Sequence, residues 1–183
     1  MDKKFDLRHL DVLSFARDAS RLEGQSDLAD WSRLADELYG SPPSVPVRVV
    51  WQLQGHTAVQ ADGTEQIWLN LQASVDLPMQ CQRCLTPVLQ TVKAERAFRF
   101  VADEATAEAL DDEAEEDILA LSRDFDAAAL VEDELILSLP LVPLHEQCPV
   151  AVPMTAIDPA FEEAAARPNP FGVLAGLKTG KPH

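Results

Sequence analysis

The sequence predicts an α+β fold: an antiparallel β-meander of three or more long strands packed by helices, with a flexible acidic loop and a helical C-terminal tail. Hydrophobic and polar residues alternate over residues 47–53, 67–79 and 88–100. A period of two indicates strands with one face on a core and the other in water. A later apolar stretch, residues 127–139, has the length of a helix and lacks this alternation. Strands followed by a helix that can cover their apolar face indicate the α+β class.

The three alternating runs are expected to pair in chain order. Asp62-Gly63 separates the first run from the second and is a strong signal for a tight hairpin turn. Two further residues predict irregularities: Gly55 indicates a bulge, and Pro78 indicates the end of a strand. The connection between the second and third runs contains two cysteines, so a site built on them would lie at one end of the sheet.

Helices are expected before and after the strands along the sequence. We interpret residues 1–40 as an N-terminal helical segment, in which Asp11 caps one helix and Ser26 or Asp27 caps another. Asp126 is expected to cap the apolar helix, which continues to Leu139 before Pro140 ends it.

These elements predict one domain overall. Residues 41–153 form its β-sheet core domain with the packed helix, and residues 154–183 form a tail of short helices. Within the tail, Asn169-Pro170 is a favourable helix start that places three apolar side chains on one face: Phe171, Leu174 and Leu177. We expect this face to be buried against the core or against a partner.

Composition restricts the class of protein. The chain has 183 residues, 46% of them hydrophobic, which suffices for a core. Its three cysteines do not form a secreted disulfide framework. The N-terminus lacks an apolar signal core, and no apolar run approaches the roughly 18 residues of a membrane span. We therefore expect a cytoplasmic protein with no membrane contact.

Charge is distributed unevenly along the chain. The total is 15 basic and 31 acidic residues, or −16, which favours basic partners over nucleic acid. Residues 103–117 carry nine acids and no base, which predicts a mobile, solvated loop or a partly helical segment. Four bases gather near the third strand: Arg83, Lys93, Arg96 and Arg99. Arg96 is in phase with the apolar residues of that strand, so it is expected to point inward. Two interpretations of the acids at 132–134 stay open: a solvated helix face, which is slightly favoured, and a pair between Arg96 and Glu134.

The candidate site consists of two short strings, Cys81-Gln82-Arg83-Cys84 and His145-Glu146-Gln147-Cys148. They contain every cysteine of the chain, and each offers two ligands at close spacing. Zinc takes four ligands in a tetrahedron, and thiolates with imidazole suit it. The sequence therefore predicts a structural zinc site formed by Cys81, Cys84, His145 and Cys148.

Two other interpretations of these strings stay open. Thiol–disulfide exchange of the thioredoxin type uses a C-x-x-C motif at a helix N-terminus, whereas this motif lies in a predicted β-hairpin. The simplest alternative is a set of plain cysteines at a turn beside a surface histidine. Elsewhere in the sequence no nucleophile–base set, phosphate-binding loop or metalloprotease helix is found, so no enzymatic activity is expected.

Three strings together resemble the YceD family. They begin at Leu77-Pro-Met-Gln-Cys-Gln-Arg-Cys, at Leu130-Val-Glu-Asp-Glu-Leu-Ile-Leu, and at Arg167-Pro-Asn-Pro-Phe-Gly. Members of this family are described as large ribosomal RNA subunit accumulation proteins. The resemblance implies a bacterial cytosolic protein that is needed for normal levels of this RNA and has no established enzymatic activity. Some relatives carry two C-x-x-C-like pairs, and here His145 and Cys148 stand in the place of the second pair.

Two functional hypotheses follow. In the first, the chain is a non-enzymatic ribosome-biogenesis factor whose acidic surface escorts a basic ribosomal protein or contacts a pre-ribosomal particle. In the second, it binds RNA directly through the basic hairpin formed by Arg83, Lys93, Arg96 and Arg99. A thiol–disulfide redox protein is a minor alternative.

Overall fold

A five-stranded sheet forms the centre of the computed structural model, which describes residues 5–40, 46–111 and 114–151. The strands are β1 (Arg21–Asp27), β2 (Arg48–Val59), β3 (Glu65–Gln80), β4 (Pro87–Val101) and β5 (Asp117–Ala120). Their order in the sheet follows the chain. The first four strands are antiparallel neighbours, and β5 runs parallel to β4. The predicted α+β fold with a meander of long strands is confirmed.

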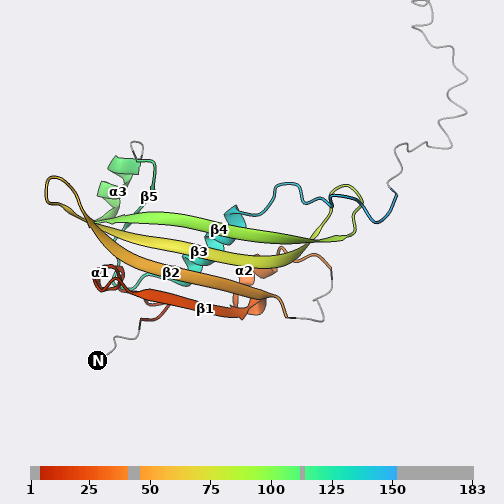
Figure 1. Ribbon diagram of the computed structural model, residues 1–183, viewed down its shortest axis with the longest axis horizontal. Helices are drawn as coiled ribbons and strands as arrows, with labels where there is room; N and C mark the ends of the chain where they lie inside the picture. Colours follow the sequence, from red (N-terminus) through yellow and green to blue (C-terminus); the bar gives the residue numbers. More distant parts are fainter. Residues whose placement is uncertain (1–4, 41–45, 112–113, 152–183) are drawn as a thin grey trace, which may run out of the picture.

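One face of this sheet carries the core. Along β3 every second side chain from Ile67 to Met79 is buried, and Leu69, Leu71 and Leu77 are fully enclosed. The helices α1 (Val12–Arg17), α2 (Ser32–Ala35) and α4 (Ala127–Leu137) pack against the sheet (Figure 1). Burial of alternate residues is the physical basis of the period of two in the sequence.

The helix α4 begins where the sequence predicted. Asp126 caps it by accepting a hydrogen bond from the Ala129 N–H at 2.9 Å, and Val131 and Leu135 are fully buried. Glu134 is also buried, and the Arg96 Nε lies 3.2 Å from its Oε2, so of the two interpretations the pair between β4 and this helix is confirmed.

Gly55 and Pro78 were both expected to interrupt strands, and both lie inside continuous ladders. Gly55 allows α1 to approach: a Cβ there would lie 2.7 Å from Phe15 Cδ1 and 2.8 Å from Ala16 Cα. Pro78 turns its carbonyl away from β4, because that oxygen accepts a hydrogen bond from the Tyr39 N–H at 2.9 Å. Its missing N–H therefore costs the β3–β4 ladder no hydrogen bond.

The N-terminal 40 residues are not uniformly helical, and this expectation is corrected. Between α1 and the short 3₁₀ turn η1 (Leu28–Asp30) lies the edge strand β1, which pairs with β2 along its whole length. The strand is mostly polar, so its alternation gave little signal. Gly24 leaves room for the Trp51 ring of β2, because a Cβ at residue 24 would lie 2.7 Å from Cζ2 of that ring.

The acidic segment 103–117 was expected as a loop or as partly helical, and it contains the helix α3 (Glu104–Asp111) and the start of β5. Asp103 accepts hydrogen bonds from the Thr106 N–H at 2.8 Å and from its hydroxyl at 2.7 Å, as an N-cap does. Ala107 and Ile118 are buried, and the Arg99 Nε lies 3.0 Å from Glu116 Oε1. Capping, burial and this ion pair offset the repulsion among the acids. The tail helices predicted within 154–183, with Phe171, Leu174 and Leu177, lie outside the described residues.

Candidate metal centre

The first half of the candidate centre is the turn between β3 and β4. The Cys81 N–H donates to the Thr86 carbonyl at 3.0 Å, and the Leu85 N–H donates back to the Cys81 carbonyl at 2.8 Å. Leu85 adopts a positive φ of 59°, which tightens the turn. This closed turn brings Cys81 and Cys84 to the same side, as in a zinc knuckle.

The second half is the chain that follows α4. After Leu137 it contains no further helix or strand up to residue 151, the last residue described. Backbone and side-chain bonds fasten it to the hairpin: the Gln82 N–H donates to the Pro143 carbonyl at 2.9 Å, and Gln90 Nε2 donates to the Leu144 carbonyl at 3.3 Å. In Figure 1 this segment runs from α4 to the end of the sheet where β3 and β4 meet.

All four predicted ligands meet at this end of the sheet. One possible ligand atom from each of Cys81, Cys84, His145 and Cys148 lies within 4.8 Å of all the others. The Cys81 and Cys148 sulfurs are 3.9 Å apart, and Cys84 Sγ lies 3.4 Å from His145 Nδ1. Zn–S bonds of about 2.3 Å in a tetrahedron place two sulfurs about 3.8 Å apart, so these separations suit a metal ion. The cluster could therefore hold one.

The charge state of the cluster also favours a cation. Burial raises the pKa of the Cys81 thiol, but hydrogen bonds from the Cys84, His145 and Arg83 N–H groups and from the His145 ring lower it to about 5. The hydrogen bond with the Thr86 hydroxyl is the main cause that lowers the pKa of Cys84. Hydrogen bonding to Cys81 raises the pKa of His145 despite partial burial. Thiolate is the form of cysteine that binds metal, so this environment prepares Cys81 and Cys84. Burial raises the pKa of Cys148, and His145 must lose its proton before it can bind a metal.

The interpretation as a thioredoxin-type redox motif finds little support in the geometry. The two cysteines of the C-x-x-C string lie in a β-hairpin turn, and no helix begins there to lower a thiol pKa. Cys81, Cys84 and Cys148 are all free thiols.

Arg83, one of the bases of the expected basic hairpin, also contacts the cluster. Its Nε donates to Cys148 Sγ at 3.0 Å, and its Nη2 donates to the His145 carbonyl at 2.8 Å. Its position between the two cysteines was a usable signal, but only the fold shows that its target is the other half of the cluster.

Most of the bases in the basic hairpin have interaction partners within the same chain. Arg83 is bound to the second half of the cluster, Arg96 pairs with Glu134, and Arg99 lies beside Glu116. Lys93 is exposed, and no ion pair involves it among the described residues. Of the four bases expected to face a phosphate backbone, three have partners within the chain.

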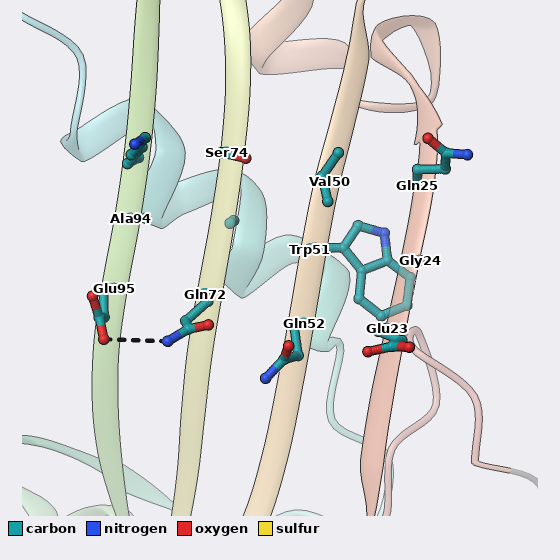
Figure 2. Close-up of a pocket in the computed structure, with 12 residues that line it drawn as sticks. Glu23, Gly24, Gln25, Val50, Trp51, Gln52, Gln72, Ser74, Ala94 and Glu95 are labelled. Atoms are coloured by element: carbon teal, nitrogen blue, oxygen red, sulfur yellow. Dashed lines mark hydrogen bonds between the residues drawn. The ribbon is translucent and has the colours of Figure 1, made fainter.

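A shallow hollow lies on the open face of the sheet, across β1 to β4 (Figure 2). Half of its lining residues are glutamines or charged residues, Val50 and Trp51 add apolar surface, and Gln72 Nε2 donates to Glu95 Oε1 at 3.2 Å. The helix α4 lies behind the strands in this view, so the hollow is open to solvent. It has no grouping of ligands comparable to the cysteine–histidine cluster.

In the part of the chain that the structure describes, no helix is long and apolar enough to cross a membrane.

Comparison with known proteins agrees with these features. The family model described as "Large ribosomal RNA subunit accumulation protein YceD" matches residues 69–178, more than half of the chain and both halves of the cluster. A protein with this name from Haemophilus influenzae is 35% identical over 134 residues, which cover 72% of this chain and 77% of the relative. No solved structure matches the chain. The chain therefore belongs to the YceD family, which is named for the accumulation of large-subunit ribosomal RNA rather than for an enzymatic activity.

Proposed function

We propose that this protein is a non-enzymatic factor that supports accumulation of large-subunit ribosomal RNA, and that it carries one structural zinc ion. The observation that carries the zinc assignment is the meeting of three sulfurs and one imidazole within 4.8 Å. Closed sites with four protein ligands are structural, whereas catalytic zinc keeps a position open for water or substrate. Zinc at this site would cross-link the β3–β4 turn to the chain that follows α4.

The mode of action that we propose is escort of a basic ribosomal protein. A net charge of −16 attracts basic proteins and repels RNA phosphates. The engagement of Arg83, Arg96 and Arg99 within the chain supports this mode over direct RNA contact. Acidic side chains on such a surface would screen a basic partner until it meets its RNA.

Affinity purification of the full-length protein with and without ribonuclease tests this proposal. We expect a basic large-subunit protein to stay bound after ribonuclease treatment and to dissociate as salt is raised, because the contact is between opposite charges. The Lys93→Ala variant is the matched control and should bind as the wild type does. Binding that ribonuclease abolishes and Lys93→Ala weakens would assign the function to direct RNA contact instead.

A further inference from the structure

A groove with exposed leucines opens beside the metal centre. It encloses about 580 Å³ between the residues after α2, the end of β3 and the chain after α4. Its apolar lining includes Leu38, Tyr39, Met79, Leu137, Leu139 and Leu141. Leu38, Met79 and Leu139 contact the core, whereas Leu137 is 73% exposed and Leu141 is 99% exposed. The groove thus has a buried floor and a leucine wall that faces solvent.

Exposed apolar side chains are concentrated in the segments in and beside the cysteine–histidine cluster, and two of them, Leu137 and Leu141, line the groove. Among the described residues, the large exposed hydrophobics other than Val50 and Val59 lie in the segments 85–89 and 137–150. Both segments flank the cysteine–histidine cluster. Single exposed hydrophobics are ordinary on a protein surface, but a contiguous group of them marks an interaction site.

Hydrogen bonds at the cysteine–histidine cluster hold part of the outer wall of the groove. Leu137 belongs to α4, whereas Leu141 lies in a segment without helix or strand. The hydrogen bond between the Gln82 N–H and the Pro143 carbonyl joins that segment to the hairpin at 2.9 Å. The bonds from Arg83 to Cys148 and to the His145 carbonyl hold the next residues. Release of this segment would move Leu141 away from the floor of the groove.

The charge at the rim indicates the occupant. Asp36 and Glu37 are exposed at the edge of the groove, and no lysine or arginine is among its lining residues. An apolar side chain would pack against the leucines of the wall, and a flanking lysine or arginine would pair with the two carboxylates. We infer that this groove is the docking surface for such a segment of a basic protein, and that the metal centre holds the groove open. This inference rests on the proposed escort function and names the surface that performs it.

Photo-cross-linking from two positions tests the assignment. One full-length variant carries benzoylphenylalanine at residue 141, and a second carries it at residue 59. Each variant is mixed in a separate reaction with proteins extracted from purified large ribosomal subunits. Val59 is a matched control because it is also exposed, at 73%, and lies by the β2–β3 turn at the opposite end of the sheet (Figure 1). We expect a cross-link from residue 141 only, to an apolar side chain next to lysine or arginine.

Substitutions give the second arm of the test. We expect Leu141→Ser to weaken binding of the cross-linked protein at least tenfold and Val59→Ser to leave it unchanged, since an exposed anchor in a groove carries much of the binding energy. Arg83→Gln should also weaken binding of the cross-linked protein. Arg83 contacts Cys148 and the His145 carbonyl outside the groove, but its loss would free the segment that carries Leu141. Circular dichroism shows whether each variant keeps its fold.

The outcomes separate the surface from the function. A basic protein that binds wild type and Leu141→Ser equally, or cross-links equally from residues 141 and 59, overturns the groove and leaves the escort function intact. Cross-links from residue 141 only to a second copy or to residues 152–183 of the same chain overturn the assigned occupant. A wild-type protein that binds none of the large-subunit proteins overturns both.

Discussion

The guanidinium of Arg83 donates a hydrogen bond from Nε to the Sγ of Cys148 at 3.0 Å, across 65 positions of sequence. The same side chain reaches the His145 carbonyl at 2.8 Å. Three thiolates and a neutral imidazole around Zn²⁺ carry a net charge of −1, and an adjacent guanidinium neutralises it. A hydrogen bond to a metal-bound group also orients that group. Arg83 therefore joins the two halves of the cluster independently of any metal.

The first prediction is that the purified, untagged protein contains one equivalent of zinc. Four possible ligand atoms within 4.8 Å of one another can complete a structural zinc site. Elemental analysis gives the stoichiometry, and Cys148→Ser should lower the metal content well below one equivalent. A wild-type protein that lacks metal, and whose folding does not change in chelator, would contradict this prediction.

The second prediction concerns Arg83→Gln. Loss of a group that orients a metal ligand reduces metal affinity by about 10–100-fold, so this variant should release zinc to a competing chelator at a lower chelator concentration. In the metal-free protein Cys148 should also react more slowly with an alkylating reagent, because the guanidinium lowers the pKa of this thiol and its loss reduces the thiolate fraction.

Gln82→Ala serves as the control for Arg83→Gln. Gln82 lies in the same turn, and its amide contacts the Gln80 carbonyl rather than the cluster. Equal zinc affinity and equal Cys148 alkylation in both variants would remove the positioning role of Arg83.

The third prediction concerns the packing of α4. Leu135 is fully buried, so Leu135→Ala should lower the free energy of unfolding by about 2–5 kcal/mol, from lost burial and the cavity left behind. Leu137→Ala on the same helix should cost less than about 0.5 kcal/mol, because that side chain is mostly exposed. Denaturant unfolding measures both values, and equal losses would mean that the helix does not cover the sheet as described.

The fourth prediction concerns the contact between α1 and β2. A Cβ at residue 55 would lie 2.8 Å from the Ala16 backbone, which cannot rotate away as a side chain does. Gly55→Ala should therefore destabilise the protein by about 1–3 kcal/mol, the usual cost of overpacking. Thermal unfolding measures the change. A more stable variant would show that α1 does not pack this closely.

Local chemistry was sufficient for much of this fold. The period of two identified β2, β3 and β4 because one face of each is buried, and Asp11 and Asp126 were recognised as N-caps because their carboxylates satisfy free N–H groups. Arg96 was expected to point inward because it is in phase with the apolar residues of its strand, and it pairs with Glu134. The four candidate ligands could be listed because two short strings with cysteine or histidine at both ends have the spacing of zinc ligands.

Other features depend on partners distant in sequence. The strand β1 is mostly polar and forms because β2 offers it an unpaired edge, while α3 forms in a run of acids because Asp103 caps it and its apolar side packs. The amino-acid sequence by itself determined β2, β3 and β4, the caps at Asp11 and Asp126 and the set of candidate ligands, because each depends on neighbouring residues. Only the tertiary structure decided that Arg83 binds Cys148 and that leucines flank the centre, since both follow from the meeting of segments about sixty residues apart.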